Sequence, residues 1–118
     1  MPILIANLST GKGTWGHVSR LIEDRQWNKV FLITNEFGKE NFTKNEKTEL
    51  IIIDQNLGIK EIQEEIRSKL KSKIKDTEVW INMVSGTGKE HMALLSACLK
   101  LGLGINLIAL TKDGIKEI

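Results

Sequence analysis

Two glycine-rich segments hold the residues of this sequence that can do chemistry on a phosphate group. The first runs Ser9-Thr10-Gly11-Lys12-Gly13-Thr14-Trp15, and the second runs Ser85-Gly86-Thr87-Gly88-Lys89-Glu90. Glycine lets the backbone approach an anion closely, and the first N–H groups of a following helix are free to donate to it. Hydroxyl side chains add donors, and lysine adds a positive charge. We therefore predict that these two segments bind a phosphate-bearing small ligand.

Neither segment is a complete nucleotide-binding fingerprint. The pair Gly88-Lys89 lacks the upstream glycine of a P-loop, because Met83 stands in that place. The dinucleotide pattern Gly-x-Gly-x-x-Gly is met by Gly11, Gly13 and Gly16. The nearest acidic partner for a ribose is Glu36, about 20 residues after the loop. A mononucleotide- or dinucleotide-binding domain is therefore the alternative hypothesis.

Several residues beside these segments have two interpretations each. His17 and His91 stand in the first turn of the helices that follow, where a histidine either contacts a phosphate or is simply solvated. Trp15 either stacks on a base or anchors its own loop. Asn7 and Asn82 lie inside apolar runs, so they either bond to each other or orient the loops above them.

The apolar pattern predicts alternating strands and helices. Apolar runs indicate buried strands at residues 3–8, 30–34, 50–53, 79–84 and 105–110. Helices are expected from about Val18 to Trp27, over 59–70 and over 89–101, while 36–47 is a short helix or a loop. A turn at 112–114 precedes a short antiparallel strand at the C-terminus.

This alternation predicts an α/β fold with three layers, a Rossmann-like domain over residues 1–118 with a mostly parallel sheet of five or six strands. If the strand order is 3-2-1-4-5, the two glycine-rich segments follow neighbouring strands. They then meet at the point where the strand order reverses, which is where ligands bind in such sheets.

The composition narrows the function further. The 118 residues have a formal net charge of +2, too small to predict binding to a long nucleic acid by charge alone. Because Cys98 is the single cysteine, an internal disulfide and a cysteine-based zinc site are excluded. No apolar run reaches the roughly 20 residues of a membrane span, and the first residues do not read as a signal peptide. We expect a cytoplasmic protein with no membrane contact, no metal and no cofactor.

The second glycine-rich segment and its flanks resemble a known motif. Residues Trp80–Ala93 form an apolar strand with an asparagine, then Ser85-Gly86-Thr87-Gly88-Lys89, then an apolar helix. This is similar to the second motif of CARF domains, the sensors of CRISPR-associated defence, whose usual form is Thr-Gly-Gly-Thr-Lys. Threonine and glycine are transposed here, and the lysine keeps its place. Leu8-Ser9-Thr10-Gly11 is similar to the first motif of that family.

The resemblance implies a Rossmann-like domain that stands alone and binds a cyclic oligoadenylate as a homodimer. Some members of the family also cleave the ring without a metal, and the alternatives of a pure sensor and a ring nuclease both stay open. For cleavage, the resemblance implies that Lys89 stabilises charge on the phosphate while Ser9 or Thr10 positions the ribose.

The helix expected at Lys89–Leu101 is relevant to the oligomeric state of the protein. Its sequence is apolar over most of its surface, so we expect it to be heavily buried. A ring of several nucleotides has more surface than one small domain can enclose. We therefore expect a homodimer around the ligand loops, in which a partner helix covers whatever apolar surface one domain leaves open.

Overall fold

The apolar runs assemble into one six-stranded sheet in the computed structural model, which describes residues 2–118. The strands are β1 (Ile3–Asn7), β2 (Lys29–Thr34), β3 (Thr48–Ile52), β4 (Glu78–Asn82), β5 (Gly104–Thr111) and β6 (Gly114–Glu117). Their order is β3-β2-β1-β4-β5-β6, and only β6 runs antiparallel to its neighbour. The predicted α/β class, the predicted order and the C-terminal antiparallel strand are confirmed.

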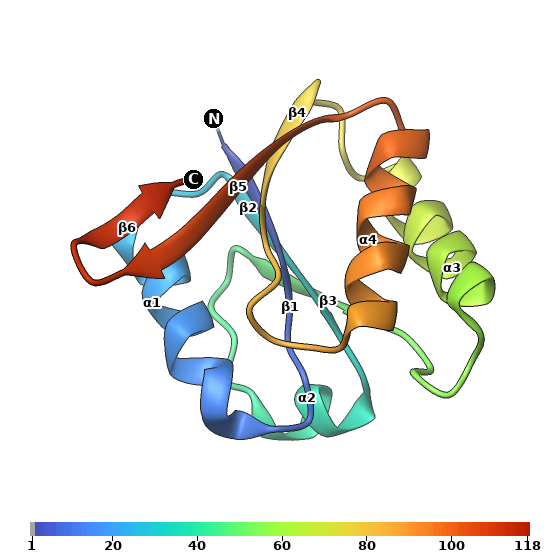
Figure 1. Ribbon diagram of the computed structural model, residues 1–118, viewed down its shortest axis with the longest axis horizontal. Coiled ribbons are helices and arrows are strands. Elements are labelled where there is room, and N and C mark those ends of the chain that lie inside the picture. Colours follow the sequence, from blue (N-terminus) through green and yellow to red (C-terminus); the bar gives the residue numbers. More distant parts are fainter. Residues whose placement is uncertain (1) are drawn as a thin grey trace.

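Helices cover both faces of this sheet and complete the three layers (Figure 1). The helix α1 (Trp15–Asp24) lies on one face, and α3 (Ile59–Lys71) and α4 (Gly88–Lys100) lie together on the other. A short helix α2 (Glu36–Asn41) lies at the lower edge of Figure 1, where the parallel strands end. No helix within residues 2–118 is long and apolar enough to span a membrane.

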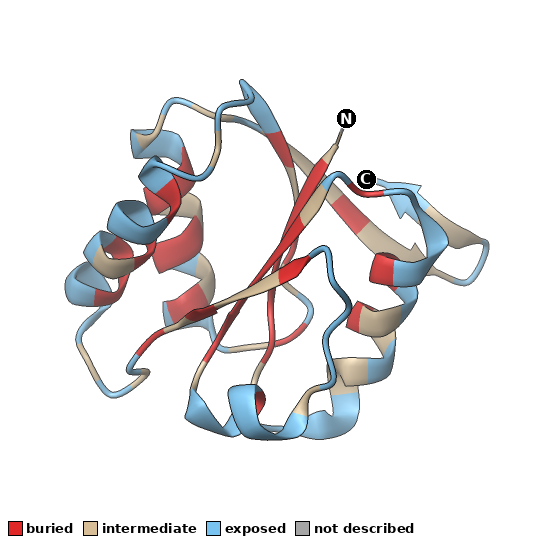
Figure 2. Ribbon diagram, turned by 180° about the vertical axis from the view of Figure 1, so that it is seen from behind, coloured by how far each residue is buried: buried red, intermediate tan, exposed pale blue. Residues whose placement is uncertain are grey.

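The sheet alternates its side chains between two apolar cores. Along β1, Ile3 and Ile5 face the core shared with α3 and α4, and Leu4 and Ala6 face the core shared with α1. Both faces are therefore covered, as the unbroken apolar runs indicated. Figure 2 shows the same pattern, with buried residues along the strands and on the inner sides of the helices.

The first helix ends earlier than the sequence pattern suggested. It ends at Asp24, because Arg25 has an extended backbone with φ −130° and ψ 155°. Trp27 lies beyond the end of the helix but packs into the same apolar core as the buried side of α1. Its indole N–H donates to the carbonyl oxygen of Leu21 over 2.8 Å. A bulky apolar residue thus caps the end of the helix rather than extending it.

The helix α4 has an apolar outer surface that the domain does not cover. Its inner residues Ala93, Leu94 and Ala97 are fully buried, whereas Met92 and Leu99 are 64% and 65% exposed. The expectation of heavy burial is wrong for this outer stripe, because a helix on a single sheet face can bury only one side.

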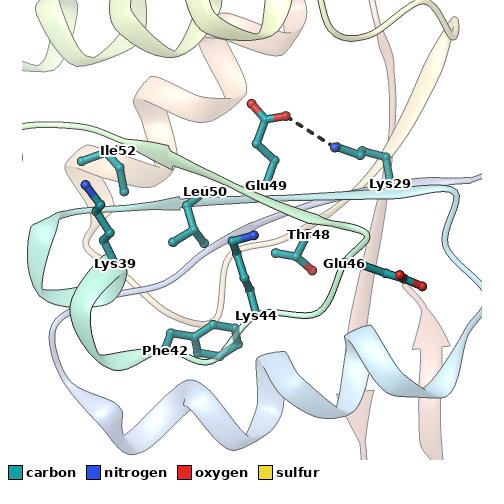
Figure 3. Close-up of a pocket in the computed structure, with 9 residues that line it drawn as sticks. All are labelled: Lys29, Lys39, Phe42, Lys44, Glu46, Thr48, Glu49, Leu50 and Ile52. Atoms are coloured by element: carbon teal, nitrogen blue, oxygen red, sulfur yellow. Dashed lines mark ion pairs between the residues drawn. The ribbon is translucent and has the colours of Figure 1, made fainter.

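The free edge of the sheet at β3 is lined with charged side chains (Figure 3). Glu49 pairs with Lys29 over 3.5 Å and also with Lys73, and the hydrogen bond from Lys73 is the largest cause that lowers the pKa of this carboxyl below 4.5. The ammonium of Lys69 donates to the carbonyl oxygen of Ile52 over 2.6 Å. Charges of this kind protect an edge strand from pairing with another chain.

Candidate functional site

The two glycine-rich segments meet at the carboxyl ends of β1 and β4. These strands are direct neighbours, with Ala6 opposite Asn82, so the loops that follow them lie side by side. A hydrogen bond joins the loops, in which the backbone N–H of Ser9 donates to Ser85 Oγ over 2.7 Å. Ser85 is 1% exposed, so its hydroxyl fastens one loop to the other rather than facing a ligand.

The first loop is held by its own tryptophan. The indole N–H of Trp15 donates to the carbonyl oxygen of Ser9 over 2.8 Å, and Ser9 Oγ donates to Gly11 O over 3.1 Å. The Trp15 ring packs against Phe37 and Phe42 at centroid distances of 6.0 and 5.6 Å. Of the two interpretations of Trp15, the structure therefore shows the anchor.

The outer part of the first loop is open to solvent. Thr10, Gly11, Lys12 and Gly13 are exposed, and Thr14 is half-buried. The ammonium of Lys12 lies 5.7 Å from the centroid of the Trp15 ring, a cation–π distance. A positive charge and the loop backbone are thus presented together on the surface.

The second loop begins with a backbone conformation that requires glycine. Gly86 has φ +99°, where other residues are strained. A Cβ at this position would lie 3.2 Å from Asn7 Cβ and 3.4 Å from both Glu90 Oε1 and His91 Nε2. The loop therefore passes so close to β1 and α4 that a side chain does not fit without movement.

The start of α4 is closed by a capping box. The N–H of Thr87 donates to Glu90 Oε1 over 2.8 Å, and the N–H of Glu90 donates to Thr87 Oγ1 over 3.3 Å. Glu90, 6% exposed, serves this cap. Because the cap uses the donors of Thr87 and Glu90, the N–H groups of the exposed residues Gly88 and Lys89 are the ones an anion can reach.

The side chain of Lys89 extends to a third loop. Its ammonium donates to the carbonyl oxygens of Gln55 and Leu57, both over 2.9 Å. These residues follow β3, so the lysine ties the start of α4 to the loop before α3. The sequence places Lys89 beside the second glycine-rich loop, and it does not show this long-range contact.

His17 and Asn82 form a link under the loops that sequence reasoning missed. Asn82 Nδ2 lies 3.1 Å from His17 Nε2 and donates to Ile108 O over 2.8 Å. The N–H of Leu110 also donates to His17 Nε2, over 3.3 Å. Because both neighbours of this nitrogen are donors, His17 is an unprotonated acceptor, and burial lowers its pKa below 6.5. Neither a solvated histidine nor a bond between Asn7 and Asn82 is found.

Asn7 is a fully buried residue beside the loops whose amide has no partner, and Thr14 Oγ1 in the first loop is a second buried atom without one. Asn7 is 1% exposed at the end of β1, and neither its Nδ2 nor its Oδ1 has a hydrogen-bond partner within the described chain. An unpaired buried amide costs about 1–3 kcal/mol per group. Gly86 passes directly beside this residue, since a Cβ added at Gly86 would lie 3.2 Å from Asn7 Cβ.

The positions of His91, Cys98 and the possible metal ligands define the roles of the remaining candidate residues. His91 Nε2 lies 2.8 Å from the carbonyl oxygen of Ser85, so this ring supports the second loop from within. Burial raises the pKa of the Cys98 thiol to about 12, as expected for an inert core residue. Within residues 2–118 no group of three His, Cys, Asp or Glu side chains is placed to hold a metal ion.

A matched pair of glycine variants tests the geometry of the second loop. Gly86→Ala should lower the free energy of unfolding by about 1–3 kcal/mol, because alanine is strained at this φ and meets Asn7. Gly88→Ala should change it by less than about 1 kcal/mol, because no atom lies within 4 Å of its added Cβ. Urea unfolding followed by circular dichroism measures both, and equal midpoints for the two variants would contradict the described loop.

The link at His17 predicts an acid-sensitive fold. Its pKa in the folded state lies below 6.5, so the unfolded chain takes up this proton first. Stability is complete above about pH 6.5 and falls as the pH drops from there towards the folded pKa. Thermal unfolding of His17→Gln should show a weaker pH dependence between about pH 7 and 5.5 than the unchanged protein. His91→Gln is the control and should keep the full dependence; the same slope in all three proteins argues against the link.

Comparison with known proteins agrees with this geometry at the level of fold. The structure is similar to a solved chain described as "Enterococcus italicus Csm6 bound to cyclic hexa-2'-fluoro-hexa-dAMP", with a TM-score of 0.60 and 14% identity. The match covers 95% of this chain and 34% of that one, so this chain spans about a third of its length. No protein-family profile and no curated protein matches the sequence. Csm6 is a CARF-domain protein, and the fold of this chain is CARF-like.

Proposed function

We propose that this domain is a CRISPR-associated sensor that binds a cyclic oligoadenylate at the interface of two copies in the cytoplasm. The observation that carries the proposal is the junction of the two glycine-rich loops, fastened by Ser9 and Ser85 above the unpartnered amide of Asn7. The CARF-like fold supports it, because the Csm6 chain of similar fold was solved with a cyclic adenylate analogue.

Phosphate groups of the ring would bind across both loops. The N–H groups of Gly88 and Lys89 open a helix of 13 residues, whose dipole favours negative charge at that end. The exposed backbone at Gly11–Gly13 follows β1, the neighbour of β4, and the ammonium of Lys12 lies 5.7 Å from the centroid of the Trp15 ring in the same loop. Asn7 would add one donor and one acceptor at the junction, which relieves the cost of its burial.

The side chain of Lys89 could contribute to ligand binding in two ways. Its ammonium would either leave the carbonyl oxygens of Gln55 and Leu57 for a phosphate or hold that loop beside the bound ring. In both cases Lys89→Ala weakens binding, by about 1.5–3 kcal/mol if the lysine makes a charged hydrogen bond to the ligand.

Cleavage of the bound ring is the enzymatic form of the same proposal. A ribose 2'-hydroxyl would lose its proton to water and attack the adjacent phosphorus in line, while the bond to the 5'-oxygen of the next nucleotide breaks and that oxygen takes up a proton. The ring then opens to a chain that ends in a cyclic phosphate, and the protein would hold the in-line geometry and stabilise charge on the phosphate. The exposed Thr10 is the better placed of the two residues to position the ribose, because Ser9 Oγ donates to Gly11 O. Lys89 is the proposed source of charge stabilisation.

A mononucleotide or dinucleotide is the second candidate ligand. One observation favours it: Glu36, two residues after the end of β2, lines a cavity together with Thr10 of the first loop. An acidic residue at the end of the second strand binds ribose hydroxyls in dinucleotide-binding folds. Saturation by NAD or ATP in preference to cyclic adenylates would select this candidate.

A second copy would supply the other half of the binding surface. The outer stripe of α4 carries Met92 and Leu99, and Val84 just before the second loop is 48% exposed. A two-fold axis through this region would duplicate the loops into a symmetric cradle for a symmetric ring. It would also cover apolar surface that one domain leaves in water.

Calorimetric titration with cyclic tri-, tetra- and hexa-adenylate tests the proposed ligand. One ring should bind, and Asn7→Leu should weaken that binding at least about tenfold without lowering the unfolding midpoint, because it removes an unpaired buried amide. Asn82→Leu is the matched variant and should be destabilised, since it leaves Ile108 O without this donor and removes one of the two donors to His17.

The outcomes of this titration separate the possibilities. No heat with any ring overturns the proposal. Normal binding by Asn7→Leu removes the role given to this amide. Products formed from the ring in the presence of a chelator support metal-independent cleavage, and an intact ring after long incubation with excess protein leaves the binding function alone.

The proposed assembly is tested by light scattering. The unchanged protein should have twice the monomer mass of 13.3 kDa, and Leu99→Glu should shift it to the monomer because a charge enters the apolar contact. Ile59→Glu changes an apolar residue that is 40% exposed at the start of α3, and this control should leave the mass unchanged. A mass near 13.3 kDa at micromolar concentration, with and without ligand, rules out the dimer.

A further inference from the structure

A cavity of about 490 Å³ lies along β3, the free edge strand of the sheet (Figure 3). Its apolar surface comes from Leu50 and Ile52, which share one face of β3, and from Phe42, the residue that follows α2. All three side chains are half-buried. Because Leu50 and Phe42 pack against the core shared with α1, this apolar surface belongs to that side of the sheet.

The surface is open because α2 does not lie across it. This helix has six residues and is pressed onto the end of β2, since a Cβ added at Gly38 would overlap Thr34 Oγ1. It ends before Phe42, whose backbone is extended with φ −99° and ψ 127°. Residues 42–47 then return to β3 without a helix or a strand. The other face of the sheet is covered by two helices of 13 residues each, so the face of β3 beside α1 lacks a helical layer.

The charge around this cavity is positive. Three ammonium groups lie on lining residues and two more are bonded to lining residues, and they belong to Lys29, Lys39, Lys44, Lys69 and Lys73. The carboxylates of the lining are Glu46 and Glu49, and Glu49 is shared by two of these lysines. Within residues 2–118, Lys39 and Lys44 form no ion pair, and neither does Glu46. The surplus of positive charge favours a negatively charged partner.

We propose that this cavity is a docking groove for an amphipathic helix with acidic side chains, presented by a partner protein. The apolar stripe of that helix would cover Leu50 and Ile52. Its acidic residues would pair with Lys39 and Lys44, which stand on either side of Leu50 in Figure 3. The proposal does not rest on the proposed function, because the groove shares no lining residue with the two glycine-rich loops.

The length of the groove and the chemistry of its edge fit a helix rather than a strand. The five residues of β3 span about 13 Å, which about nine residues of a helix match. A strand would have to pair with the backbone of β3, where Lys69 already donates to the carbonyl oxygen of Ile52 and Glu49 holds two ammonium groups. A helix needs no backbone hydrogen bonds from the groove, because its own backbone is paired internally.

Amide NMR spectra of the full chain with three synthetic peptides of about 15 residues test the groove. The first peptide has leucines at helical spacing with glutamates beside them, the second has the same composition in scrambled order, and the third has lysine in place of glutamate. The first should shift the signals of Lys39, Phe42, Lys44 and Leu50, and the other two should leave them in place. No shift with the first peptide, or equal shifts with the first and the second, would overturn the proposal.

Two double variants of equal net charge provide the matched control. Lys39→Glu combined with Lys44→Glu should weaken the binding of the acidic peptide about fivefold or more, because two attractions become repulsions. Lys100→Glu combined with Lys112→Glu makes the same change of charge outside the groove and should bind as the unchanged protein does. All four lysines are exposed, so both variants should fold. Equal affinities of the two variants contradict the docking groove.

Two further measurements distinguish other occupants of the groove. Light scattering without peptide should give the same mass for the unchanged protein and for Lys39→Glu combined with Lys44→Glu. A different mass would make a second copy of this chain the occupant. A short single-stranded DNA that shifts the signals of Phe42 and Leu50, where the acidic peptide does not, would make the occupant a nucleic acid. Either result overturns the proposal.

The outcomes also separate the groove from the proposed function. If the acidic peptide binds and no cyclic oligoadenylate does, the docking groove stands and the proposed function fails. If a cyclic oligoadenylate binds and the acidic peptide does not, the proposed function stands and the docking groove is wrong.

Discussion

The candidate site depends on the parallel pairing of β1 with β4. These strands are separated by most of the sequence, and their pairing is what brings the two glycine-rich loops to one place. The hydrogen bond from Ser9 N–H to Ser85 Oγ, 2.7 Å long, then joins the loops, and Ser85 itself is buried. Because the backbone of one loop is bonded to the side chain of the other, neither loop can move far alone. The arrangement is therefore preorganised, which lowers the cost of ordering it around a ligand.

The two asparagines at the ends of these strands differ in their hydrogen bonding. Asn82 has partners on both sides, because it contacts His17 and donates to Ile108 O. Asn7 is equally buried but has none within the described chain. A protein selected for stability alone would favour an apolar residue in that position, since an unpaired buried amide is costly. The contrast between two chemically identical side chains on neighbouring strands is the observation behind the proposal that the junction of the loops binds a ligand.

Local patterns predicted most of the fold and the place of the site, and long-range contacts account for what they missed. The strands, the three main helices and the order of the sheet follow from apolar runs, helical periodicity and the connection rules for parallel strands. The capping role of Glu90 is also local, because its partner Thr87 is three residues away. By contrast, the contact of Lys89 with Gln55 and that of His17 with Leu110 join residues far apart in sequence, and no spacing in the sequence indicates them. The exposed stripe at Met92 and Leu99 was missed because composition does not say which side of an apolar helix is covered.

The helix α4 connects the parts of the site that the strands alone do not join. Its first turn carries the free N–H groups of Gly88 and Lys89, and the Lys89 side chain reaches the loop that supplies Gln55 to the neighbouring cavity. Its inner face is packed into the core with α3, so the helix is a fixed element between the second loop and the loop after β3. Its outer face is the apolar stripe available to a second copy. A displacement of α4 by a partner would therefore change the second loop and the loop after β3 together, because both are bonded to the same turn of this helix. The proposed assembly and the proposed ligand binding would both act on α4, so each would alter the free energy of the other.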